Sequence, residues 1–205
     1  MKKFVLGALA LLLLLVLGLL GWGMTQPSET SVVREVVIAD SVQDVQATLE
    51  DLTTWPEWSY WTNEVDPDAK FTFSGSKTGK GAVWEWDSEG PLGTGSLSIT
   101  DTVPGRVDMI LHFDPEGASV QNITYLELVA TPDGGTKVTW TLDADLPNLV
   151  WRITAGLGLL EKMVGEQYEA GLANLKIRHE MPDSDVVEGD PAGDDEFEYD
   201  LVDDD

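Results

Sequence analysis

The chain contains no cysteine and only two histidines, and its 12 Lys and Arg residues are far outnumbered by 37 Asp and Glu residues. The absence of cysteine excludes disulfide bonds, a thiol nucleophile and the acylated cysteine of a lipoprotein. His112 and His179 alone cannot supply a zinc ligand set, so we expect neither a metal nor a cofactor. The net charge of −25 disfavours nucleic acid and anionic lipid headgroups as partners of the folded part.

Residues 4–22 form an uninterrupted apolar run, which Lys2 and Lys3 precede. At about 1.5 Å per residue the run makes a helix of about 28 Å, close to the roughly 30 Å hydrocarbon thickness of a bilayer. We expect a single transmembrane helix with residues 1–3 in the cytoplasm, which places the rest of the chain outside it, on the periplasmic side in a bacterium. A cleaved signal peptide is the alternative, although the run exceeds the usual apolar core of about 7 to 15 residues.

Residues 31–180 are long enough for one domain with a single hydrophobic core, and residues 23–30 link this domain to the apolar run. The stretch that follows, residues 181–205, is rich in Asp and Glu and has no Lys or Arg. Such a segment cannot bury enough apolar surface to offset its ordering entropy, so we expect a disordered acidic tail. Binding of cations or of a basic partner by this tail is the alternative.

Secondary-structure signals change along the domain in a readable order. Residues 32–39 are rich in β-branched side chains and predict a strand, after which Asp40 and Ser41 offer an N-cap for a short helix. Three tryptophans around Pro56 follow, and the proline disfavours a continuous helix there. Six further strand-like runs, separated by Gly, Pro or Asp, predict an antiparallel meander: residues 70–74, 82–87, 95–102, 106–113, 120–131 and 136–142.

Residues 147–179 carry apolar side chains at intervals of three and four, which predicts one long amphipathic helix that Pro147 opens. It is the only predicted element long enough to cover the apolar face of a sheet of this size. The expected fold class is therefore α+β. We expect a seven-stranded antiparallel curved sheet wrapped around a long C-terminal helix, preceded by one transmembrane helix.

Three segments of the domain resemble the SRPBCC superfamily, whose START-like helix-grip fold occurs in lipid-transfer domains and in the polyketide cyclase/dehydrase family. They are residues 55–61 (WPEWSYW), 79–86 (GKGAVWEW) and 161–176 (EKMVGEQYEAGLANLK), and the resemblance extends over residues 31–180. It implies a cavity between the helix and the sheet that accepts an apolar small molecule or a lipid. It does not imply a reaction.

Candidate ligand-binding residues follow from that implied cavity together with strand and helix periodicity. Trp84 and Trp86 share one strand face, and glycines at 156, 158 and 165 thin the helix surface opposite the sheet. In a solid core the same rings merely fill volume, and this alternative stays open. The expected cavity residues are Trp55, Trp58, Trp61, Trp84, Trp86, His112, Tyr125, Trp140, Ile153, Leu160 and Val164.

Three hypotheses for function remain at this point. The leading one is a membrane-tethered binder of an apolar ligand with no catalytic residue, in which Trp55, Trp58 and Trp61 lie near the cavity mouth and cap the pocket or touch the bilayer interface. The second is an enzyme of cyclase or dehydratase type that uses a polar cavity residue such as His112 or Tyr125. The third is a protein-interaction module with a filled core.

Overall fold

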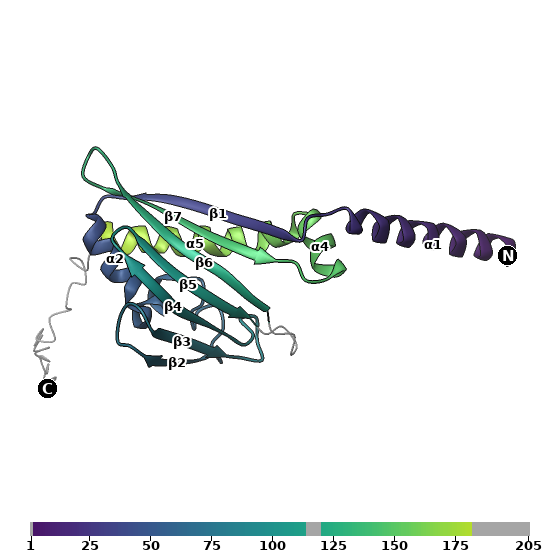
Figure 1. The fold of residues 1–205 in the computed structure, drawn as a ribbon. Coiled ribbons are helices and arrows are strands. Elements are labelled where there is room, and N and C mark those ends of the chain that lie inside the picture. The colour runs from purple at the N-terminus through teal and green to yellow at the C-terminus, as the bar shows by residue number, and fades with distance from the viewer. Residues whose placement is uncertain (1, 114–119, 182–205) are drawn as a thin grey trace, which may run out of the picture.

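The computed structural model describes residues 2–113 and 120–181, so the predicted acidic tail lies outside the described residues except for Met181. Helix α1 (Lys2–Met24) covers the whole predicted apolar run and projects from the end of an α+β domain (Figure 1). No part of its most apolar window is buried inside the protein. A short connection leads from α1 to the first strand, β1 (Glu29–Ile38).

One antiparallel sheet holds all seven described strands, in the order β1-β7-β6-β5-β4-β3-β2. Strands β2 to β7 follow one another as a meander, and β1 pairs with β7 at the other edge. The bounds are β2 (Lys70–Gly75), β3 (Ala82–Asp87), β4 (Gly95–Val103), β5 (Arg106–Phe113), β6 (Val120–Ala130) and β7 (Thr136–Asp145). The predicted meander is confirmed, and β7 continues beyond its predicted end.

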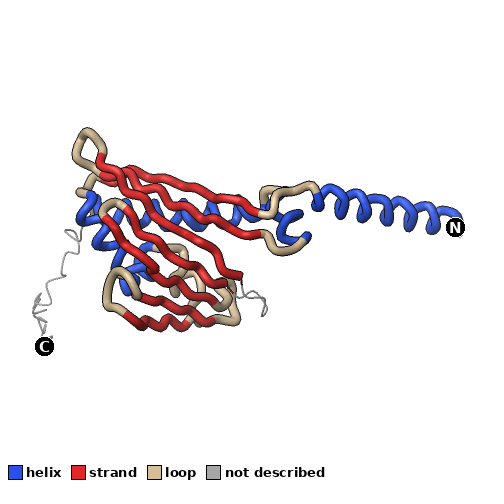
Figure 2. Tube along the Cα trace, in the orientation of Figure 1, coloured by secondary structure: helices blue, strands red, loops and turns tan. Residues whose placement is uncertain are grey.

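Alternation of side chains gives the sheet a buried inner face and an exposed outer face. In β3, Ala82, Trp84 and Trp86 are buried, whereas Glu85 and Asp87 are exposed. The turn from β4 to β5 needs a glycine, because residue 105 has a φ of 81° that favours a residue without Cβ. Helix α5 (Leu159–Glu180) lies across the inner face and packs beside β1 (Figures 1 and 2).

Helix α2 (Val42–Glu50) begins at the predicted N-cap, where Ser41 Oγ accepts a hydrogen bond from the backbone N–H of Asp44. The 3-10 turn η1 (Leu52–Thr54) and helix α3 (Trp55–Trp58) follow it. Pro56 stands in the first turn of α3, where a missing N–H costs no intrahelical hydrogen bond. The proline therefore starts a short helix, and no continuous helix runs through this segment, as the sequence predicted.

The C-terminal segment forms two helices, so the prediction of one continuous helix over residues 147–179 is wrong. Helix α4 (Leu149–Gly156) begins at the N-cap Asn148, and α5 starts after Gly158. The backbone N–H of Gly158 bonds to the carbonyl of Ala155, and Gly158 has a left-handed φ of 73°. A left-handed glycine after the last turn is a common helix terminator, and it separates α4 from α5.

The core at the middle of the domain is aromatic. Trp55, Trp58 and Trp140 are at most 1% exposed, and the Trp55 ring centroid lies 4.6 Å from that of Trp58 and 5.5 Å from that of Trp140. Tyr168 of α5 stacks on Trp140 with a centroid distance of 3.8 Å. These contacts join α3, the sheet and α5 into one packed unit.

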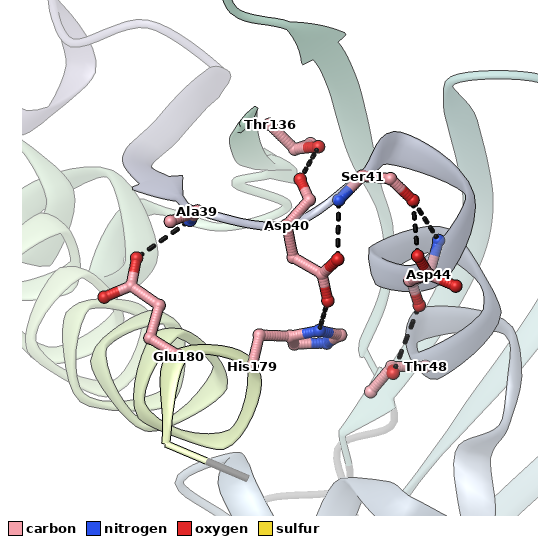
Figure 3. Close-up of polar contacts among 8 residues, drawn as sticks. All are labelled: Ala39, Asp40, Ser41, Asp44, Thr48, Thr136, His179 and Glu180. Carbon is pink, nitrogen blue, oxygen red and sulfur yellow. Dashed lines mark hydrogen bonds and ion pairs between the residues drawn. The ribbon is translucent and has the colours of Figure 1, made fainter. Parts of the chain in front are cut away.

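Polar contacts fix the end of α5 that is far from α1 (Figure 3). The Asp40 carboxylate accepts a hydrogen bond from Nδ1 of His179 at 2.7 Å, and the Glu180 carboxylate accepts one from the backbone N–H of Ala39 at 2.8 Å. Thr136 Oγ1 also donates to the carbonyl of Asp40 at 2.7 Å. We name Asp40, His179, Ala39 and Glu180 the terminal latch, because they hold α5 to the corner between β1 and α2.

The terminal latch predicts a stability that depends on acid pH. The hydrogen bond from His179 holds the pKa of Asp40 below its usual range, and the N–H of Ala39 has the same effect on the pKa of Glu180. A carboxyl pKa that folding lowers adds stability above the unfolded pKa, near 4, and this stability is lost as the pH falls through the folded pKa.

We therefore expect the unfolding free energy of the native protein to fall more steeply than that of Asp40→Asn as the pH decreases from about 5 to about 3. The difference between the two slopes corresponds to the uptake of up to about one additional proton on unfolding. Urea unfolding followed by circular dichroism measures both slopes. Asp68→Asn is the control, because Asp68 is exposed and lies outside the latch. Equal slopes for the native protein and Asp40→Asn would contradict a role of the latch in acid stability.

Candidate ligand cavity

An apolar cavity of about 160 Å³ lies between the beginning of α5 and the sheet. Its walls come from β3, β5, β6 and β7, from α4 and α5, and from the segments that follow α3 and β3. The strand register places it at the end of the sheet nearest α1, where Glu29 pairs with Asp145 and Gly95 pairs with Phe113. The cavity and α1 are therefore at the same end of the domain.

The floor of the cavity depends on a glycine in β4. Trp86 faces the cavity from β3, and its ring lies over Gly95 of the neighbouring strand. A Cβ at residue 95 would lie 2.5 Å from Cζ2 of Trp86, a distance that real Cβ atoms do not tolerate. Any side chain at position 95 would therefore push the Trp86 ring out of its place in the cavity wall.

A buried carboxylate fixes the loop that closes one side of the cavity. Asp66 is 2% exposed and accepts hydrogen bonds from Oγ of Ser88 at 2.6 Å and from the backbone N–H of Leu92 at 3.2 Å. The Ser88 hydrogen bond holds the pKa of Asp66 below its usual range. These bonds keep Pro91 and Leu92 in the cavity wall.

The described part of the cavity wall carries little charge. Among the described residues that line the cavity, Asp145 is the only charged one, and none is Lys or Arg. Asn122 of β6 shares the inner face with Leu111, its partner in the register, and adds a polar side chain to a mostly apolar wall. Its Oδ1 atom is buried with no hydrogen-bond partner in the described part of the chain.

Behind the cavity the interior is solid. Trp55, Trp84 and Trp140 surround a void of only about 10 Å³ together with Tyr168. A void of this size holds at most one water molecule. The sequence left open whether the inward-facing rings fill a solid core or line a cavity. The structure has both, a filled aromatic core in the middle of the domain and a cavity at the end next to α1.

The structure brings together four of the predicted ligand-binding residues, because Trp61, Trp86, Leu160 and Val164 all line the cavity. Trp55, Trp58, Trp84 and Trp140 belong instead to the buried core. Trp55 and Trp58 are thus buried away from the cavity, and of the three tryptophans expected at its mouth only Trp61 borders it.

Three predicted residues lie elsewhere. His112 and Tyr125 alternate with inward-facing neighbours and point to the outer face of the sheet, where the guanidinium of Arg106 stacks over the Tyr125 ring at 4.0 Å. The strand period of two explains this placement, because Leu111 and Phe113 on either side of His112 face the cavity. Ile153 does not line the cavity; it packs against Gly23 of α1.

The helix glycines do not leave the empty volume that the sequence suggested. A Cβ at Gly165 would lie 2.0 Å from Nη2 of Arg34, which forms ion pairs with Glu161 and Glu169 of α5. A Cβ at Gly156 would meet Trp22, and Gly158 ends α4. Gly156 and Gly165 therefore allow close approach of other elements, and Gly158 serves the break between the helices, so none of the three glycines lines the cavity.

Several cavity residues were absent from the sequence prediction. Alternation in β5 would have identified Leu111 and Phe113 once the neighbouring His112 was placed outside, and a polar residue in the inward row of β6 was the signal for Asn122. Tyr60 and Leu146 lie outside regular elements and carried no such signal. The other missed residues include Trp151 of α4 and Met163 and Gln167 of α5.

Within the described part of the chain, the arrangement can bind a ligand but offers few groups for chemistry. The candidate acid and base, His112 and Tyr125, do not reach the cavity, and His179 belongs to the terminal latch at the opposite end of α5. Among the described residues no group of three or more His, Asp or Glu side chains is placed to hold a metal ion.

A seven-stranded antiparallel sheet that grips a C-terminal helix, with a cavity between them, defines an α+β protein of the START-like helix-grip class. The chain belongs to the family described as polyketide cyclase / dehydrase and lipid transport, whose model matches residues 29–180. No curated protein gives a significant match to the sequence.

Solved structures support the same fold. An uncharacterised protein from Rhizobium leguminosarum is similar with a TM-score of 0.54 and 18% identity, and the match covers 74% of this chain and 95% of that one. The Aha1 dimer from Colwellia psychrerythraea gives 0.53 and 15%, covering 74% and 97%. A START superfamily protein from Mycobacterium smegmatis gives 0.51 and 17%, covering 73% and 97%. At these identities the likeness concerns the fold alone.

Proposed function

We propose that this chain is a membrane-anchored protein that binds an uncharged apolar ligand, such as a lipid or isoprenoid alcohol, without catalysing a reaction. The observation that carries the proposal is the apolar cavity at the end of the domain next to α1. Membership of a family described as including lipid transport supports an apolar ligand. The outward placement of His112 and Tyr125 favours binding over the enzyme hypothesis.

Anchoring rests on α1. Residues 3–24 form the one helix, within the described part of the chain, that is long and apolar enough to cross a bilayer. Its apolar side chains are exposed, which is costly in water and favourable in hydrocarbon. Lys2 and Lys3 favour a cytoplasmic N-terminus, so the domain is placed outside the cytoplasm in this proposal.

The cavity volume limits how much of a ligand it encloses. Its value of about 160 Å³ is below the roughly 300–1,000 Å³ that is usual for pockets that bury a drug-sized molecule. The cavity therefore encloses one end of a ligand, the end that carries the hydroxyl, rather than a whole two-chain lipid. The remainder of the ligand extends past Tyr60 and Gln167, which line both this cavity and an adjoining surface hollow.

The absence of cationic side chains from the described cavity wall predicts selection between neutral and anionic ligands. Burying a carboxylate without a cation is costly, whereas a hydroxyl can donate a hydrogen bond to the unpaired Oδ1 of Asn122. At about pH 8, where a fatty acid in water is largely ionised, we expect a fluorescent long-chain alcohol to bind at least about tenfold more tightly than the matching fatty acid. Fluorescence titration of the full chain in detergent micelles, corrected for micelles alone, measures both affinities.

Asn122→Leu separates the hydrogen bond from the apolar contacts. We expect this variant to weaken alcohol binding about three- to tenfold and to raise the free energy of unfolding, because it removes a buried polar atom that has no hydrogen-bond partner among the described residues. Tighter binding of the acid than of the alcohol would contradict the proposed ligand class. Failure of both probes, and of organic extracts analysed by mass spectrometry, would contradict ligand binding itself.

A further inference from the structure

An apolar surface on α4 and at the α4–α5 junction is exposed beside α1. Val150, Leu157 and Leu159 are 72%, 57% and 54% exposed, and we name these three residues the α4 surface. Leu157, the C-cap residue of α4, follows Val150 by about two helical turns, so the two side chains lie on the same side. Exposed apolar side chains gathered in one place mark an interaction site more often than isolated ones do.

Helix α4 is held directly against the last turn of α1. A Cβ at Gly23 would lie 2.5 Å from Cγ1 of Ile153 and 2.9 Å from Cδ1 of Leu149, and one at Gly156 would lie 2.8 Å from Cη2 of Trp22. Side chains of α4 therefore pack on Gly23 of α1, and a side chain of α1 packs on Gly156 of α4. This close packing fixes α4 at the level where α1 ends.

The length of α1 indicates the depth at which its C-terminal end lies in a bilayer. Its 23 residues span about 35 Å at 1.5 Å per residue, slightly more than the roughly 30 Å of hydrocarbon. Trp22, near the end of the helix, then falls at the boundary between hydrocarbon and headgroups, where tryptophan is enriched. Because α4 packs on Trp22 and Gly23, it lies at the same depth.

The charge distribution is consistent with this depth. The chain carries a net charge of −25, yet residues 146–160 contain no Asp or Glu and a single charged residue, Arg152. A segment without acidic residues in so acidic a chain can approach a lipid surface that repels the rest of the domain. The acidic excess elsewhere favours a zwitterionic surface over an anionic one.

We propose that the α4 surface is a bilayer contact, which holds the cavity at headgroup level so that an apolar ligand passes between one leaflet and the cavity without crossing bulk water. This inference rests on the proposed span of α1, and it adds a second membrane contact and a route. Leu146, Trp151 and Leu160 connect the two sites, because they belong to the same segment and line the cavity.

The absence of cysteine makes a direct test possible. Single cysteines at Val150 and at Leu157 are labelled with a fluorophore in the full chain, which is reconstituted in two sets of phosphatidylcholine vesicles. One set contains lipids with a quenching group near the headgroup end of the acyl chain, and the other contains lipids with the quenching group near the methyl end. Leu12→Cys, in the middle of α1, is the control for insertion and is read with the methyl-end quencher. Val129→Cys, exposed on the outer face of β6 toward the other end of the sheet, is the control for a position in water.

We expect quenching at residues 150 and 157 to exceed that at residue 129 at least threefold. Quenching at residue 12 but not at residues 150 and 157 would overturn the bilayer contact and leave the anchor intact. No quenching at residue 12 would instead remove the anchor on which both proposals rest. Probes at 150 and 157 that become immobilised without being quenched would mean that protein, rather than lipid, covers the α4 surface, and this also overturns the proposal.

A second measurement tests the route. Val150→Asp and Leu157→Asp place a charge on the α4 surface without altering a cavity residue. We expect each variant to slow transfer of the fluorescent alcohol from the protein to the surrounding vesicle at least fivefold while its equilibrium affinity in micelles stays within twofold of the native value. Unchanged transfer rates in both variants would overturn the proposed route even if the probes are quenched.

Discussion

Trp140→Ala is expected to lower the free energy of unfolding by about 3–5 kcal/mol, a large share of the roughly 5–15 kcal/mol that stabilises a typical domain. Trp140 is 1% exposed and is packed between Trp55 and Tyr168. The void beside this ring measures only about 10 Å³, so its neighbours cannot compensate for the lost volume without moving. The substitution also removes a contact between α5 and the sheet, because the stacked Tyr168 belongs to α5.

Trp140→Phe separates ring packing from hydrogen bonding. The indole N–H donates to Oγ1 of Thr124 at 3.0 Å, and that hydroxyl also interacts with the phenol oxygen of Tyr168 at 3.1 Å. Phenylalanine keeps a ring but removes this donor, so we expect a smaller loss of about 1 to 2 kcal/mol. Denaturant unfolding followed by circular dichroism measures both variants. A cost below about 1 kcal/mol for Trp140→Ala would contradict a tightly packed core at this position.

The sequence predicted the strands well because their ends carry local signals. Glycine, proline and aspartate interrupt the alternating runs, and turns such as the one at Gly105 need a backbone conformation that glycine adopts freely. Inward placement of Trp84, Trp86 and Trp140 followed from the period of two. These features depend on residues that are close together in the chain, so a single sequence contains them.

The helix break and the cavity depend on contacts that the sequence does not display. Ile153, Leu157 and Leu160 preserve the spacing of three to four residues through the break, so the pattern alone predicts a continuous helix. Core tryptophans and cavity tryptophans also have the same alternation, and only the three-dimensional arrangement separates Trp84 in the core from Trp86 in the cavity wall. The contact of α4 with Gly23 joins segments more than a hundred residues apart and had no local signal.

Val164→Trp is expected to abolish binding of the fluorescent alcohol, with a loss of affinity of at least about 100-fold, or about 2.8 kcal/mol. Val164 of α5 lines the cavity opposite the sheet, and an indole in its place occupies most of a volume of about 160 Å³. Filling an apolar cavity adds buried surface without overpacking. We therefore expect the free energy of unfolding to stay within about 1 kcal/mol of the native value or to rise.

Leu175→Trp is the matched control, because Leu175 lies on the same helix and is fully buried, away from the cavity. Overpacking at this position should lower the free energy of unfolding by about 1 to 3 kcal/mol, while the folded protein keeps its affinity for the alcohol. Val164→Trp is therefore expected to change binding but not stability, and Leu175→Trp to change stability but not binding. If Val164→Trp instead destabilises the protein as much as Leu175→Trp and leaves probe binding unchanged, the ligand occupies another surface and the cavity is not the binding site.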